Sequence, residues 1–97
     1  MRVNNIVVST KAYAVNGSVV HKLYRKIPYD ELLALLRKDE MAFLEHPDGS
    51  RLKRQTVHRA SRSLSDSLGK MVVYCEAVMQ VGERGIEGFL LEVSKEE

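Results

Sequence analysis

Alternating apolar and polar residues near the N-terminus predict a β hairpin. Residues 3–15 and 19–27 are rich in Val, Ile and Tyr, and Asn16-Gly17 between them suits a type I′ turn, whose two central positions need positive φ. This turn places Lys11 opposite Lys22. The same polar face carries Tyr13, Tyr24 and Lys26. The predicted core face carries His21 and the apolar residues Ile6, Val8, Ala12, Ala14, Val19, Leu23 and Ile27.

A second hairpin is predicted towards the C-terminus. Every second residue from Met71 to Val81 is apolar, the segment Gly82 to Gly85 forms the turn, and residues 86–93 return. The apolar positions are Met71, Val73, Cys75, Ala77, Met79 and Val81, followed by Phe89, Leu91 and Val93. Because Cys75 belongs to this apolar alternation, we expect a buried and unreactive thiol.

Two amphipathic helices are predicted between the hairpins. Pro28 suits a first helical turn, and the leucines at positions 32, 33, 35 and 36 supply a buried stripe, so we expect a helix over residues 28–38. The clearer helix begins near Gln55 or Thr56 and ends before Gly69, because glycine is typical of helix C-termini. Its apolar stripe has spacings of three and four residues and consists of Val57, Ala60, Leu64 and Leu68.

The segment between the helices, Met41 to Glu45, either extends the first helix or forms a short strand. We favour the strand, because Asp39 and Glu40 interrupt the apolar stripe. Residues 47–50 (Pro-Asp-Gly-Ser) are a strong turn signal, after which residues 51–54 would return beside the strand.

The resulting order is strand, strand, helix, short strand, helix, strand, strand, which is typical of an α+β fold. We therefore expect a mainly antiparallel sheet, built from the N- and C-terminal hairpins, packed against two helices. A chain of 97 residues with 44% apolar residues suits one small domain. We place this domain at residues 1–94 and a disordered tail at residues 95–97.

Composition argues against membrane and secreted classes. No apolar run approaches the roughly 18 residues of a membrane-spanning helix, and the N-terminus lacks the basic-then-apolar pattern of a signal peptide. The single cysteine cannot form an internal disulfide, which is typical of a reducing compartment. These features favour a cytoplasmic location and no membrane partner.

Charge is unevenly distributed, although the net charge is only +2. Residues 51–70 hold six basic residues and one acid, a net charge of +5, whereas residues 71–97 hold two basic residues and six acids, a net charge of −4. Such asymmetry indicates the kind of partner a protein attracts. Here it indicates a polyanion.

The second helix makes this indication more specific. At about 100° per residue, His58, Arg59 and Arg62 fall opposite the apolar stripe and face solvent. No acid in the first turn offsets Lys53 and Arg54, so this helix end attracts a phosphate oxygen. The predicted nucleic-acid contacts in this basic strip are Arg51, Lys53, Arg54, His58, Arg59, Arg62 and Lys70. The alternative is a solvated polar face without a ligand.

The first hairpin gives a weaker indication of the same kind. Lys11 and Lys22 are interleaved with tyrosines on its polar face, and lysines and aromatic rings together bind phosphates and stack bases. We therefore add Lys11 and Lys22 to the candidate contacts. The alternative is a wet sheet face whose lysines discourage edge-to-edge aggregation.

No catalytic or metal-binding set stands out. The histidines at positions 21, 46 and 58 and Cys75 lack the two-to-five-residue spacing of metal ligands. The Gly82-Glu83-Arg84-Gly85 loop lacks the glycine pattern of a phosphate-binding fingerprint. We therefore expect no enzyme activity, no cofactor and no metal.

The sequence thus favours a small protein that binds DNA or RNA through the phosphate backbone, since no base-reading set of side chains is apparent. A homodimer is compatible with this function. The alternative function is a protein-interaction module, such as a viral or mobile-element adaptor or inhibitor, that docks on an acidic partner.

Overall fold

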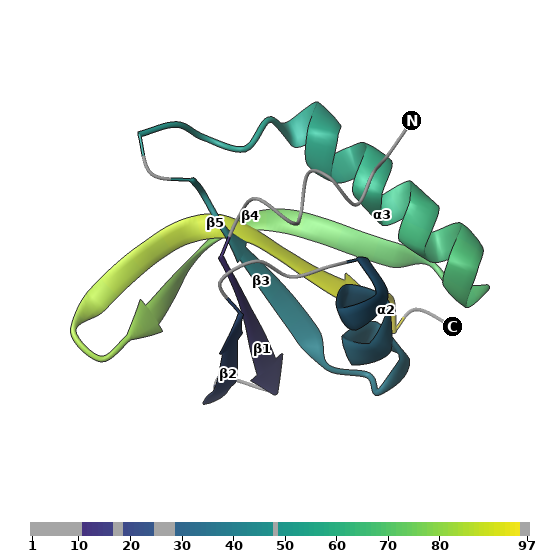
Figure 1. Cartoon of the computed structure of the whole chain (residues 1–97), viewed down its shortest axis with the longest axis horizontal. Coiled ribbons are helices and arrows are strands. Elements are labelled where there is room, and N and C mark those ends of the chain that lie inside the picture. Colours follow the sequence, from purple (N-terminus) through teal and green to yellow (C-terminus); the bar gives the residue numbers. More distant parts are fainter. Residues whose placement is uncertain (1–10, 17–18, 25–28, 48, 96–97) are drawn as a thin grey trace.

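In the residues that it describes, the computed structural model of the chain forms a five-stranded antiparallel sheet with two helices (Figure 1). It describes residues 11–16, 19–24, 29–47 and 49–95. The described elements are β1 (Ala12–Asn16), β2 (Val19–Tyr24), α2 (Tyr29–Arg37), β3 (Met41–Glu45), α3 (Arg54–Leu68), β4 (Val72–Val81) and β5 (Arg84–Val93). This order confirms the predicted α+β fold, including the short strand between the helices.

Strand β3 lies inside the sheet, with β1 on one side and β5 on the other, in the strand order β2-β1-β3-β5-β4. The prediction that residues 51–54 return beside this strand is therefore wrong, because both edges of β3 are already paired. Residues 51–53 instead form an irregular approach to α3, which begins at Arg54.

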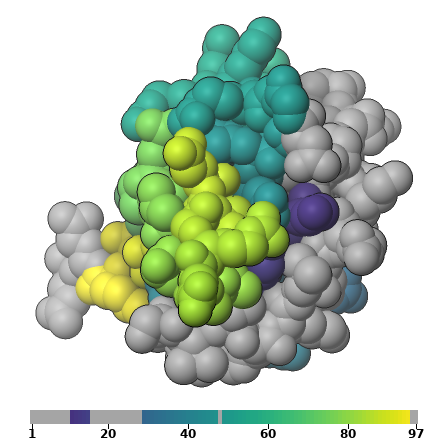
Figure 2. Space-filling model, turned by 90° about the vertical axis from the view of Figure 1, so that its left-hand side faces the viewer, coloured from purple at the N-terminus to yellow at the C-terminus, as the bar shows by residue number. Residues whose placement is uncertain are grey.

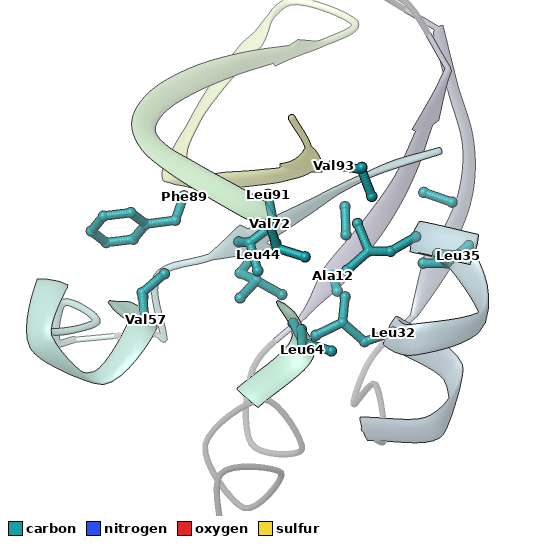
Figure 3. Close-up of a cluster of buried hydrophobic side chains, with 13 residues drawn as sticks. Ala12, Leu32, Leu35, Leu44, Val57, Leu64, Val72, Phe89, Leu91 and Val93 are labelled. Carbon is teal, nitrogen blue, oxygen red and sulfur yellow. The ribbon is translucent and has the colours of Figure 1, made fainter. Parts of the chain in front are cut away.

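Both helices cover the same face of the sheet and bury the larger apolar cluster (Figure 3). The predicted stripes supply it: Leu32, Leu35 and Leu36 come from α2, and Val57 and Leu64 come from α3. The strands add Ala12, Ala14, Ala42, Leu44, Val72, Phe89, Leu91 and Val93. Burying one leucine side chain contributes roughly 1.5–3 kcal/mol, so these contacts hold both helices on the sheet.

The opposite face of the sheet, which neither α2 nor α3 covers, carries a second buried cluster and is called here the helix-free face. It consists of Tyr13, Val15, Phe43 and Ile86. The prediction that Tyr13 lies on a polar face is wrong, since its side chain is only 7% exposed. The prediction assumed a hairpin with one buried face and one solvated face. It fails because β1 is an interior strand of the sheet, with β2 and β3 as its neighbours.

The register of the first hairpin also differs from the prediction. Asn16 pairs with Val19, and Lys22 pairs with Ala14 rather than facing Lys11. The register shifts between Ala14 and Val15, as expected for a β-bulge, and an extra residue moves every later side chain relative to its partner. The expectations for Ile6, Val8, Gly17, Lys26, Ile27 and the side chains of residues 19–24 lie outside the described residues.

The C-terminal hairpin has a shorter turn than the segment Gly82 to Gly85. Val81 pairs with Arg84, so Gly82 and Glu83 alone form the turn, and Gly82 has φ +64°. Because β4 is an edge strand, its odd-numbered residues are only partly covered. Met71 is 64% exposed, and Cys75 is exposed, so the prediction of a buried thiol is wrong.

Lys95, placed in the predicted tail, follows β5 and binds Asp39. Its Nζ lies 2.7 Å from Asp39 Oδ2, and this pair lowers the pKa of Asp39. Residues 96–97 lie outside the described residues.

We expect the Tyr13 phenol to ionise near pH 12. Burial, and the hydrogen bond that Tyr13 Oη donates to Glu45 Oε1 (2.8 Å), raise the pKa of Tyr13 to about 12. The unfolded phenol ionises near pH 10, so the resulting stability is complete below pH 10 and is lost as the pH rises towards 12. In a near-ultraviolet absorbance titration, Tyr13→Phe should remove the high-pH step and Tyr29→Phe should retain it. A step that survives Tyr13→Phe would contradict this assignment.

Candidate anion-binding surface on helix α3

Helix α3 is docked on the sheet by its predicted apolar stripe. Val57, Ala60 and Leu64 are buried, and Leu68 is half-buried at the end of the helix. Ser61 is also buried, and its hydroxyl donates a hydrogen bond to the His58 carbonyl oxygen (2.9 Å). This docking leaves His58, Arg59 and Arg62 exposed, as the helical spacing predicted.

One ridge of α3 faces β4 and is basic. Arg54, His58 and Arg62 are four residues apart, so they lie above one another on the same side of the helix. Tyr74 of β4 holds two of them. His58 Nδ1 lies 2.9 Å from Tyr74 Oη, and the Arg54 guanidinium carbon lies 5.8 Å from the centre of the Tyr74 ring. Tyr74 therefore orients the start of this ridge, a role for which the sequence gave no signal.

Two serines of α3 form hydrogen bonds with α2. Tyr29 Oη of α2 lies 2.9 Å from Ser63 Oγ and 3.1 Å from Ser67 Oγ. These two hydrogen bonds connect α2 with α3.

The start of α3 favours anions. Lys53 is the N-cap residue and provides no side-chain hydrogen bond to the helix, and the first turn contains no acid. Partial positive charge on the first N–H groups therefore adds to the charge of Lys53 and Arg54, which are both exposed.

Arg51 is held away from this surface by two glutamates. Its guanidinium nitrogens lie 2.8 Å from Glu87 Oε1 and 3.3 Å from Glu76 Oε2. The hydrogen bond to Arg51 lowers the pKa of Glu87. The two carboxylates together outweigh the single positive charge of Arg51. In the side view of Figure 2 the teal segment before α3 lies above the hairpin of β4 and β5, which these ion pairs connect to it.

The remaining predicted contacts lie at two other places. Lys70 follows the α3 cap residue Gly69 and is exposed at the C-terminal end of the helix. Lys11 precedes β1 and Lys22 lies in β2, at the sheet edge opposite β4. The structure thus brings Lys53, Arg54, His58, Arg59, Arg62 and Lys70 together along α3, and it separates Lys11 and Lys22 from them.

A groove of about 720 Å³ runs between α3 and β4. Its helix side includes His58, Arg62 and Asp66, and Lys70 lies at its end. Its strand side is formed by residues 71–74, among which Met71 is exposed and apolar, and Val72 and Tyr74 point towards α3. The groove therefore combines positive charge with apolar surface.

Of the histidines at positions 21, 46 and 58, His46 has a structural role. His46 Nδ1 accepts a hydrogen bond from the Leu52 backbone N–H (2.9 Å), and its ring packs edge-on against Phe89. Among the described residues, no three His, Cys, Asp or Glu side chains are grouped so that they would hold a metal ion.

No family model, curated protein or solved structure matches the chain. Neither helix of the described part is long and apolar enough to cross a membrane.

Proposed function

We propose that this protein binds nucleic acid through the phosphate backbone, using the outer surface of α3. The observation that supports this proposal is the exposed basic surface of one docked helix, with an N-terminus free of acids. Four side chains would contact phosphates: Lys53, Arg54, Arg59 and Arg62. Lys70 would extend the contact at the other end of the helix. Arg51 is a weaker candidate, because Glu76 and Glu87 already neutralise it.

The proposed binding depends on the charge and spacing of the phosphates rather than on the base sequence. Phosphate contacts position a protein on nucleic acid but carry no base identity. The exposed side chains of α3 are Arg54, Gln55, His58, Arg59, Arg62, Asp66 and Ser67, and Gln55 is its only amide side chain. A homodimer in the cytoplasm remains part of this proposal, because two copies would double the number of phosphate contacts.

We expect a linear loss of oligonucleotide affinity with salt and a smaller salt slope in arginine variants. The test measures fluorescence anisotropy of a labelled mixed-sequence oligonucleotide, single- and double-stranded, between about 50 and 200 mM salt. Arg54→Ala, Arg59→Ala and Arg62→Ala should each reduce the slope of log affinity against log salt by about 0.7–0.9, the value for one lost phosphate contact. The reduction should be the same for unrelated sequences.

Arg84→Ala is the matched control, because Arg84 begins β5 at the hairpin turn and is outside the α3 surface. It should leave the slope unchanged. Absence of binding by the unmodified protein at micromolar concentration and about 50 mM salt would refute the proposal, because non-specific binders are detected there.

A second candidate function is docking on an acidic protein. The groove between α3 and β4 favours this function, because nucleic-acid backbone binding makes no use of its apolar surface.

A further inference from the structure

Along the outer edge of β4, beyond Val72, the described residues leave backbone hydrogen-bonding groups without a partner. The Met71 carbonyl oxygen faces β5, where it accepts a hydrogen bond from the Ser94 N–H (2.8 Å). Backbone direction alternates along a strand, so the N–H and C=O groups of Val72, Tyr74 and Glu76 face the outer edge. At that edge Ser65 Oγ of α3 accepts the Val72 N–H (2.8 Å). No hydrogen bond from the described part of the chain reaches the backbone of Tyr74 or Glu76 on that side.

Beyond Val72, the described residues give this edge little of the usual protection against strand pairing. Natural edge strands carry Lys, Pro or bulges that prevent the addition of another strand. Strand β4 has ten residues, VVYCEAVMQV, with Glu76 as its only charge, and its pairing with β5 is continuous over its whole length. Val73 and Val78 are exposed large apolar residues on this strand. The edge can therefore accept an extended chain.

Charge along the groove indicates what kind of chain fits. The α3 wall and the groove end contribute His58, Arg62 and Lys70 against the single acid Asp66. An added strand would place alternate side chains against this basic wall and the others on the helix-free face near Val73. We propose that the groove binds an extended acidic segment of another protein, which pairs antiparallel with β4 as an additional strand. This binding mode goes beyond the proposed nucleic-acid function.

The pairing defines a sequence pattern for the partner. Side chains of Val72 and Tyr74 point to the α3 side, because both pack with the cluster under the helices. Partner residues opposite them point the same way and should be acidic, whereas the residues between them should be apolar. Partner residues of the acidic set also direct their N–H groups to β4. The expected ligand therefore alternates acidic and apolar residues.

Other occupants fit the groove less well. A second copy added through β4 would bring the basic ridge of one α3 towards the basic ridge of the other, and like charges repel. A nucleic-acid strand would satisfy the charge, but it lacks the peptide N–H and C=O groups that pair with a strand edge at two-residue spacing.

The first test uses a fluorescent eight-residue peptide of alternating Glu and Val, with both ends blocked. Fluorescence anisotropy should show binding at micromolar concentration, and a peptide of the same composition with four Glu followed by four Val should bind about tenfold more weakly. N-methylation of the Glu residues should abolish binding, because it removes the N–H groups that face β4. N-methylation of the Val residues should leave the affinity within about twofold, because those N–H groups face solvent. Equal binding by the two methylated peptides, or none by the unmodified peptide, would overturn strand addition.

The second test changes the protein. Glu76→Pro removes an edge-facing N–H without removing a hydrogen bond to β5, and it should weaken peptide binding about fivefold relative to Glu76→Ala. Arg62→Gln should also weaken it, whereas Arg59→Gln, on the outer surface of α3, should not. Equal affinities for Glu76→Pro and Glu76→Ala would refute the pairing. A mixed-sequence oligonucleotide should also be measured with Glu76→Pro and Glu76→Ala. If it binds these two variants as it binds the unmodified protein, while neither the alternating peptide nor the peptide of four Glu followed by four Val binds, nucleic acid would be left as the only partner of α3 and this inference would be overturned.

Discussion

Gly88→Ala should be the most damaging single-methyl substitution in this fold. Gly88 is buried in β5 and pairs with Glu45 of β3. A Cβ atom at this position would overlap the Leu44 carbonyl oxygen and lie 2.9 Å from the Leu44 carbonyl carbon. These atoms are backbone at the centre of the sheet, so relief requires β3 and β5 to separate. We expect a loss of at least about 3 kcal/mol in the free energy of unfolding, a large part of the total for a small domain.

Gly85→Ala is the matched control, in the same strand and without positive φ. A Cβ atom there would lie 3.2 Å from Gln80 Oε1 and from Val78 Cγ1, which are side-chain atoms on the exposed β4 edge. This substitution should cost less than about 1 kcal/mol, because side chains can move where backbone cannot. Urea denaturation of both variants measures the difference. Similar midpoints for Gly85→Ala and Gly88→Ala would show that β3 and β5 are less tightly paired at Gly88 than described.

The elements with a strong local pattern were predictable from the sequence. The stripe of Val57, Ala60 and Leu64, with Gly69 after it, determines a helix and its buried side without reference to distant residues. The two charges before Met41 likewise separate β3 from α2. Signals of this kind depend only on residues within one or two helical turns of each other. The order of the elements could therefore be predicted without knowing which distant residues pair.

Pairing between distant strands was not predictable in the same way. Nothing near Tyr13 in the sequence indicates that β1 has β3 on its second edge, or that Tyr13 meets Phe43 on the helix-free face. The register of β1 against β2, which differs from the predicted one, has the same origin. A strand pattern with period two gives opposite faces for registers that differ by one residue, and only tertiary packing selects between them.

In the candidate surface, too, features that depend on local spacing were predictable and features that depend on distant residues were not. Exposure of Arg59 and Arg62 followed from helical spacing alone. The partners of Arg51 are 25 and 36 residues away in sequence, and no local rule connects them. The groove depends on Tyr74 and the free edge of β4, and both become visible only when the strand order is known.

Leu64→Ala should produce the largest loss of stability among changes in the helices. Leu64 has no exposed surface and lies at the centre of the stripe that docks α3 on the sheet, facing Leu32 of α2 and the strand residues in Figure 3. Replacement by Ala removes three buried carbon atoms and leaves a cavity that the rigid sheet cannot fill. The expected loss is about 2–5 kcal/mol, which lowers the melting temperature by roughly 4–8 °C per kcal/mol for a domain of this size.

Leu68→Ala provides the comparison, because Leu68 is on the same stripe but only half-buried at the helix end. It should cost clearly less than Leu64→Ala in the same thermal melts, since its cavity would open to solvent. The stability loss in Leu64→Ala also matters for the proposed binding, because α3 carries the proposed phosphate contacts and one wall of the groove. If Leu64→Ala melts like the unmodified protein, then α3 is not held by its apolar stripe, and the basic ridge would not have the fixed position beside β4 on which both binding proposals depend.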